Sequence, residues 1–184
     1  MVIALHLPNT SAQEARQKPA LADFNSLRPA EAPIILCIDD KATIGGKPTD
    51  QAYAKAAANG FRSILTLRSS KDGVDTLRER LIVEKHQLRY FNLPVIALIP
   101  SHKQIDEFLG WVRDKSNHPM LANCAFIERI APYMMMFHLV EQGWSEDRAV
   151  EEASRSGLRR EDLQGLARSY LKSKANNSKP KARS

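Results

Sequence analysis

Cys124 and Arg129 are the two residues whose types and spacing best fit covalent chemistry. A cysteine thiolate is a strong nucleophile, and an arginine guanidinium can bind two oxygens of one phosphate group. Four residues separate the two, so a single loop can hold them together. By itself the pair is also compatible with an ordinary buried cysteine at a strand end. Together with a strand before it and a helix after it, the pair predicts a phosphatase loop in which a thiolate attacks phosphorus while the arginine binds the phosphate oxygens.

The flanking sequence predicts the elements that position this pair. Pro119 to Ala122 is an apolar run of the right length for a buried strand. Ile130 to Val140 predicts a helix that is buried on all sides, with Pro132 in its first turn. Cys124 is therefore expected after a strand end and Arg129 at a helix N-terminus. There the helix dipole and backbone N–H groups attract anions and lower the pKa of a nearby thiol.

Three further segments follow a family pattern. Gly45–Thr49 resembles the entry to a first helix, Gly60–Arg68 a characteristic strand, and Leu88–Val95 the strand before a general-acid loop. With the Cys-x4-Arg loop, they make the chain resemble the bacterial branch of the protein tyrosine and dual-specificity phosphatases. The resemblance implies hydrolysis of phosphotyrosine or another phosphomonoester through a Cys124 thiophosphate intermediate. It also implies no metal or organic cofactor, and a phosphorylated small molecule or phosphoprotein as partner.

The expected phosphate-binding loop departs from the family pattern. Its members are Ala125, Phe126, Ile127, Glu128, Arg129 and Ile130. Asn123 stands where the family has a His, and the β-branched Ile127 resists the left-handed conformation that an anion-binding nest needs. Glu128 adds a negative charge. These departures leave two alternatives open: an inactive pseudophosphatase that serves as a binding module, and a sulfurtransferase that carries a persulfide on Cys124.

The general acid that would protonate the leaving oxygen has two candidates. Asp72 follows a predicted strand, at the sheet edge where α/β folds bind ligands. His102 follows the next strand, and an imidazole can hold a proton near neutral pH. Each also has a structural interpretation, because Asp72 precedes Gly73 in a turn and His102 follows Ser101 at a predicted helix start.

The order of elements predicts an α/β fold with a central, mostly parallel sheet of four or five strands flanked by helices, as in protein tyrosine phosphatases. The predicted strands are 34–38, 61–67, 89–95 and 119–122, and the predicted helices include 51–59, 74–87, 130–140 and 159–172. The phosphatase-like domain is expected over residues 34–171. An N-terminal extension, residues 1–33, precedes it, and a basic disordered tail, residues 172–184, follows.

Composition restricts the class of protein. A length of 184 residues suits one domain, and 43% hydrophobic with 26% charged residues is ordinary for a globular protein. No apolar run reaches the roughly 18 residues of a transmembrane span. Two cysteines make no disulfide framework, which favours a reducing, cytoplasmic location. The net charge of +6 comes mainly from five basic residues of the tail, so nucleic acid or an anionic surface is a weak expectation. No metal-binding spacing of histidines is present.

Overall fold

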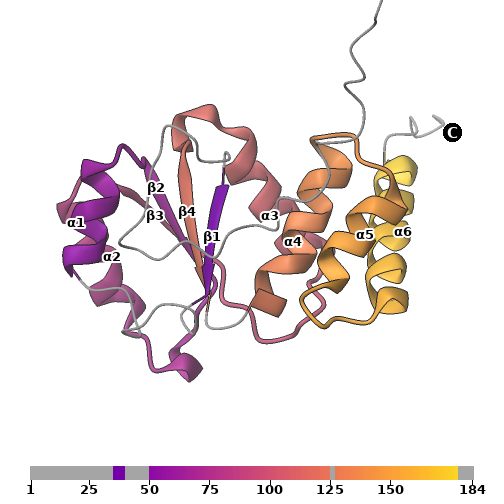
Figure 1. Ribbon diagram of the computed structural model, residues 1–184, viewed down its shortest axis with the longest axis horizontal. Helices are drawn as coiled ribbons and strands as arrows, with labels where there is room; N and C mark the ends of the chain where they lie inside the picture. Colours follow the sequence, from indigo (N-terminus) through magenta and orange to yellow (C-terminus); the bar gives the residue numbers. More distant parts are fainter. Residues whose placement is uncertain (1–34, 40–49, 125–126, 178–184) are drawn as a thin grey trace, which may run out of the picture.

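The computed structural model describes residues 35–39, 50–124 and 127–177 (Figure 1). Within them lies one sheet of four parallel strands in the order β1-β4-β2-β3. The strands are β1 (Ile35–Asp39), β2 (Ser63–Thr66), β3 (Arg89–Asn92) and β4 (Met120–Cys124). The predicted α/β class with a parallel sheet is confirmed, and the number of strands is the lower of the two predicted. The N-terminal extension and the Gly45–Thr49 segment lie outside the described residues.

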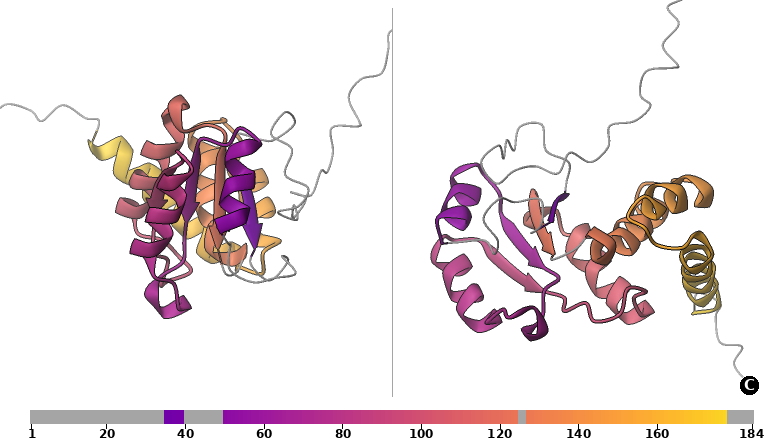
Figure 2. Two further views of the ribbon diagram at one scale, coloured as in Figure 1. Left: turned by 90° about the vertical axis from the view of Figure 1, so that its left-hand side faces the viewer. Right: turned by 60° about the horizontal axis from the view of Figure 1, so that its bottom comes forward.

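The helices form layers on both faces of the sheet, as Figures 1 and 2 show. They are α1 (Asp50–Ala58), α2 (Thr76–Lys85), α3 (His102–Arg113), α4 (Ile127–Val140), α5 (Glu146–Ser154) and α6 (Arg160–Asn177). Helices α1 and α2 cover one face, α3 and α4 cover the other, and α5 and α6 pack beyond α4. Short 3-10 helices, η3 (Ser70–Asp72) and η4 (Lys115–Asn117), occupy two connections.

Side-chain caps fix the starts of three helices. Asp75 accepts a hydrogen bond from the backbone N–H of Arg78 at the start of α2, and Ser145 does the same for α5. Ser101 and Gln104 form a reciprocal capping box at the start of α3, where His102 is the first helical residue. The predicted helix start at Ser101 is therefore confirmed.

Helix α4 begins three residues earlier than the apolar run predicts. It starts at Ile127 instead of Ile130, so Ile127, Glu128 and Arg129 are its first three residues. Pro132 therefore lies in the second turn, where its missing N–H removes one helical hydrogen bond, and the prediction that it lies in the first turn is wrong. The cost is tolerated because α4 is the central helix of the larger core, with Tyr133 fully buried.

Two apolar cores lie on opposite faces of the sheet. The smaller one joins α1 and α2 to the sheet and includes Tyr53, Val83 and Leu121. The larger one joins α3 to α6 with the other face, and Phe108 and Tyr133 meet edge-on within it. Strand β4 is buried along its whole length, because helices cover both faces of the parallel sheet.

Both tryptophans of the chain pack against the larger core. Trp111 of α3 stacks on Phe91 with ring centres 4.9 Å apart. Trp144, in the turn before α5, stacks on His138 with ring centres 4.0 Å apart. The guanidinium of Arg148, a residue of α5, lies 3.6 Å from the centre of the Trp144 ring. These contacts tie the connection between α4 and α5 to both helices.

The last helix is longer than predicted. Helix α6 continues to Asn177, so the first residues of the expected tail, 172–177, are helical, and residues 178–184 lie outside the described part of the chain. Tyr170 donates a hydrogen bond of 2.7 Å to Asp106 of α3, and Lys174 forms an ion pair with the same carboxylate. These two contacts join the C-terminal half of α6 to α3.

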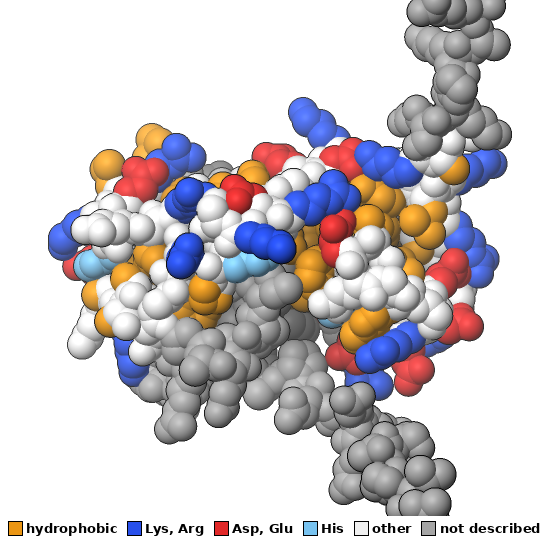
Figure 3. Space-filling model, turned by 90° about the horizontal axis from the view of Figure 1, so that it is seen from above, with side chains coloured by type: hydrophobic (Ala, Val, Ile, Leu, Met, Phe, Trp, Pro, Cys, Tyr) orange, Lys and Arg blue, Asp and Glu red, His pale blue; other side chains and the backbone are white. Residues whose placement is uncertain are grey.

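The charged side chains are of mixed sign on the upper face of the molecule. Figure 3 shows Lys and Arg interspersed with Asp and Glu there, and apolar side chains exposed toward the C-terminal helices. The carboxyl ends of the strands lie at the opposite, lower edge in Figure 1. Cys124, the last residue of β4, therefore lies at that lower edge.

Truncation of Leu121 tests the smaller core. Leu121→Ala is expected to lower the free energy of unfolding by about 2–5 kcal/mol, because it opens a cavity in the central strand. Leu81→Ala on α2 is the matched control, since Leu81 is 69% exposed and its loss is expected to cost less than about 0.5 kcal/mol. Urea denaturation measures both values, and equal effects for the two variants would contradict the assignment of Leu121 to the core.

Candidate functional site

Cys124 is the last residue of the central strand β4. Its register partner on β1 is Asp39, and its side chain is 1% exposed. The thiol belongs to the larger core, on the sheet face covered by α3 and α4. Among the described residues Cys124 forms no disulfide.

Only Ala125 and Phe126 separate Cys124 from helix α4. The predicted four-residue loop is therefore wrong in part, because Ile127 and Glu128 are helical and Arg129 is the third residue of the helix. Ala125 and Phe126 lie outside the described residues, so the predicted anion-binding arrangement of their N–H groups stays a prediction. The early helix start shortens the connection and fixes Arg129 in the first turn of α4.

Arg129 binds a carboxylate with both ends of its guanidinium. Its Nη1 donates to Oδ2 of Asp72 and its Nη2 donates to Oδ1, each at 2.8 Å. The hydrogen bond to Asp72 raises the pKa of Arg129, and the Cys124 and Glu128 charges add to this effect. Arg129 therefore interacts electrostatically with Cys124 as well as with Asp72.

The carboxylate of Asp72 is held by its own segment as well. The backbone N–H of Ser69 donates to Oδ2 at 2.8 Å and the Ser69 hydroxyl at 3.1 Å. Residues Ser70–Asp72 form η3, and Gly73 ends it in the left-handed conformation with φ of 68°. The hydrogen bond from Arg129 lowers the pKa of Asp72 to about 2, so the group is a carboxylate near neutral pH in this arrangement.

The other candidate general acid lies among different contacts. His102 Nε2 is 3.0 Å from the Ser169 hydroxyl, and its ring meets Tyr170 edge-on. Both partners belong to α6, so the described contacts of His102 join α3 to α6. The structure thus brings Cys124, Arg129 and Asp72 together, whereas His102 serves a helix–helix contact.

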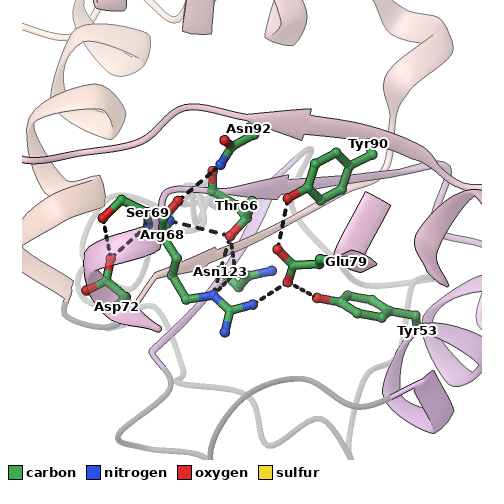
Figure 4. A network of polar contacts seen from close by, with 9 residues as sticks. All are labelled: Tyr53, Thr66, Arg68, Ser69, Asp72, Glu79, Tyr90, Asn92 and Asn123. Carbon is green, nitrogen blue, oxygen red and sulfur yellow. Dashed lines mark hydrogen bonds and ion pairs between the residues drawn. The ribbon is translucent and has the colours of Figure 1, made fainter. Parts of the chain in front are cut away.

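A buried polar network lies on the other face of the strand ends (Figure 4). At its centre is Glu79 of α2, which is 7% exposed and forms an ion pair with Arg68, itself 2% exposed. The Tyr53 hydroxyl donates to Oε1 of Glu79, and the Tyr90 hydroxyl donates to Oε2 at 2.9 Å. Burial, and then the Glu79 charge, raise the pKa of both tyrosines, so they remain donors.

The same network reaches the strand that carries Cys124. Arg68 Nε donates to the side-chain oxygen of Asn123 at 3.2 Å, and the Thr66 hydroxyl donates to that oxygen at 2.9 Å. Because side chains alternate along a strand, Asn123 and Cys124 point to opposite faces of β4. Asn123 therefore fixes the end of β4 from the α1/α2 face, without occupying the thiol's face.

Sequence reasoning missed Glu79 and both tyrosines. A Glu on a charged amphipathic helix is usually solvated, so its residue type carried no signal. Arg68 at a strand end was the one available indication, since a buried arginine requires a carboxylate partner. Asn123, singled out as a substitution for the family His, is fully buried and holds Arg68.

The described residues contain no group of three or more His, Cys, Asp or Glu side chains that could hold a metal ion. No described helix has the length and apolar composition needed to cross a bilayer.

Comparisons with known proteins agree with this architecture. Residues 21–170 match the family model described as a DSP-PTPase phosphatase fused to NAD+ kinase. The fold is similar to that of Tk-PTP in its active form, with 15% identity and a TM-score of 0.57 over 77% of this chain and 93% of that one. The fold is also similar to that of a candidate phosphatase from Neisseria meningitidis, with 17% identity and a TM-score of 0.55 over 73% of this chain and 94% of that one. For a candidate phosphatase from Shewanella putrefaciens, the identity is 15% and the TM-score is 0.57 over 80% of this chain and 96% of that one. Curated proteins gave no significant match.

Removal of Glu79 tests the buried network. Glu79→Ala is expected to lower the free energy of unfolding by about 3–5 kcal/mol, because it leaves the Arg68 charge buried without its carboxylate. Glu84→Ala, on an exposed position of the same helix, is the matched control and is expected to change stability by less than about 0.5 kcal/mol. Chemical denaturation distinguishes the two, and a small loss for Glu79→Ala would show that the pair is solvated.

Removal of Arg129 tests the second ion pair. Arg129→Met is expected to raise the pKa of Asp72 from about 2 toward its ordinary value of 3.8, and carboxyl carbon NMR across pH 1.5–6 measures it. In the wild type, the lowered pKa contributes stability above about pH 4 that is lost as the pH falls toward 2. Arg155→Met, at the C-cap of α5, is the control and should leave the Asp72 titration unchanged. A wild-type Asp72 that titrates near 3.8 would contradict the pairing.

Proposed function

Because the chain belongs to the family of DSP-PTPase phosphatases described as fused to NAD+ kinase, we propose that it is a cysteine-dependent phosphatase acting on phosphotyrosine or other phosphomonoesters. The observation that carries the proposal is the position of Arg129. It lies in the first turn of α4, directly after the strand that ends at Cys124, and its charge interacts with the thiol. A nucleophile and a phosphate-binding cation thus occupy one strand-to-helix connection at the carboxyl edge of a parallel sheet.

The proposed reaction has two steps. The Cys124 thiolate attacks phosphorus, an S–P bond forms and the P–O ester bond breaks, and the leaving oxygen takes a proton from a general acid or from water. Water then attacks phosphorus, the S–P bond breaks, and the thiolate and inorganic phosphate are released. Arg129 and the N–H groups at the start of α4 stabilise the negative charge on the phosphate oxygens in both steps.

Asp72 suits the general-acid role better than His102 does. Its carboxylate already lies against Arg129, whereas His102 contacts α6. Asp72 can donate only after it gains a proton, and its pairing with Arg129 opposes this at neutral pH. A thiolate nucleophile needs a reducing environment, which is why we place the activity in the cytoplasm.

The alternative is a pseudophosphatase that binds phosphorylated ligands without hydrolysing them. Two observations favour it over full activity. Only two residues separate the strand from α4, which limits the N–H groups that a loop can turn toward a phosphate, and Asp72 occupies the guanidinium ends of Arg129. Slow turnover with retained phosphate binding would fit this alternative.

Hydrolysis of an aryl phosphate across pH 5–8 tests the proposal. The wild type is expected to release phosphate at a rate that Cys124→Ser lowers by at least about 10³-fold, because the variant lacks the nucleophile. Cys37→Ser is the control, since it removes the other cysteine of the chain from strand β1. A phosphotyrosine peptide and NADP+, whose 2′-phosphate is a monoester, then serve as competing substrates.

Equal background rates for wild type and Cys124→Ser would overturn the enzyme proposal. If phosphate nonetheless bound to the wild type and not to Arg129→Met, the pseudophosphatase alternative would hold.

A further inference from the structure

The guanidinium ends of Arg129 are engaged by a carboxylate in the geometry that a phosphate ester would need. Each oxygen of Asp72 accepts from a separate terminal nitrogen at 2.8 Å, which is the two-point pattern by which arginine binds phosphate. We propose that Asp72 is an intramolecular competitor that occupies Arg129 until a phosphomonoester dianion displaces it. This inference rests on the proposed role of Arg129 in binding phosphate.

The segment around Asp72 is built to present this carboxylate. Ser69 holds Oδ2 with its backbone N–H and its hydroxyl, and the side chain therefore points out of η3 toward α4. The two partners are partly exposed, at 16% for Arg129 and 13% for Asp72, and are thus much less solvated than a surface ion pair. Shielding strengthens the pair relative to a solvated surface ion pair, so it is populated without a ligand.

Tethering makes the competitor effective. A group attached to the same domain acts at an effective concentration of about millimolar or higher. A ligand from solution must therefore bind Arg129 more tightly than Asp72 does in order to displace it. A singly charged carboxylate from solution offers Arg129 nothing that Asp72 does not already supply. A phosphomonoester dianion carries more charge and three oxygens, two for Arg129 and one for the N–H groups at the start of α4. The pair therefore selects for dianionic phosphate and against carboxylates.

Loss of the Asp72 charge is expected to tighten phosphate binding. If the pair is formed in about nine molecules of ten, its removal raises the apparent affinity about tenfold, because the competent state becomes fully populated. Asp72→Asn is the variant of choice, since its amide oxygen can still accept from Ser69 while the bond to Arg129 weakens. Asp75→Asn is the matched control: it makes the same charge change three residues away, and Asn caps α2 as well as Asp does.

The measurement is calorimetric titration with inorganic phosphate at pH 7.5, with thermal unfolding of each variant as a check on folding. Asp72→Asn is expected to bind about tenfold tighter than the wild type. Asp75→Asn should bind as the wild type does, and Arg129→Met should lose binding. Unchanged or weaker binding by a folded Asp72→Asn would overturn the proposal, as would a similar gain for Asp75→Asn or a failure of every protein to bind.

Carboxyl carbon NMR of the wild type provides a second test that needs no variant at Asp72. Saturating phosphate is expected to shift the Asp72 signal toward its position in Arg129→Met, and an unmoved signal under saturation would overturn the proposal. Neither measurement depends on hydrolysis. Tighter phosphate binding by Asp72→Asn in a protein without turnover would therefore support the competitor and reject the enzyme, and turnover without tighter binding would do the reverse.

Discussion

The buried ion pair between Arg68 and Glu79 is the interaction on which the carboxyl edge of the sheet depends. Glu79 accepts hydrogen bonds from Tyr53 and Tyr90, so a single carboxylate joins α1, α2, β3 and the end of β2. Through Asn123 the same network reaches β4. Further hydrogen bonds stabilise a buried charge pair, and here Tyr53 and Tyr90 donate to Glu79 while Asn123 accepts from Arg68.

A second arginine–carboxylate pair, Arg129 with Asp72, lies at the same edge but has a different character. It is partly exposed, and its carboxylate comes from a short 3-10 segment instead of a packed helix. The two ion pairs have different roles at this edge of the sheet. The buried pair fixes the strand ends, and the partly exposed one sets the charge beside Cys124. Since Asn123 and Cys124 point to opposite faces of β4, a change on the face of Cys124 need not disturb the face of Asn123.

Much of the fold could be predicted from the sequence, because the strand at 119–122 and the helix start at Ser101 are local patterns. The start of α4 could not, since polar Glu128 and Arg129 give no apolar period, and the helix extends through them to Ile127. Cys124, Arg129 and Asp72 were all identifiable as candidates by type. Their pairing was not, because a contact between residues 72 and 129 depends on how η3 packs against α4. In the same way, the contacts of Glu79 with its tyrosines depend on how α2 packs against α1 and β3.

The placement of the two tryptophans has a spectroscopic consequence. Trp111 and Trp144 both pack against the larger core, and the chain has no others. Intrinsic tryptophan fluorescence therefore reports on the α3–α6 side of the sheet and is insensitive to the α1/α2 side. Circular dichroism, in contrast, sees helices on both sides. Coincident transitions by the two probes would mean that the sheet couples its two cores into one cooperative unit, and separated transitions would mean that each face melts by itself.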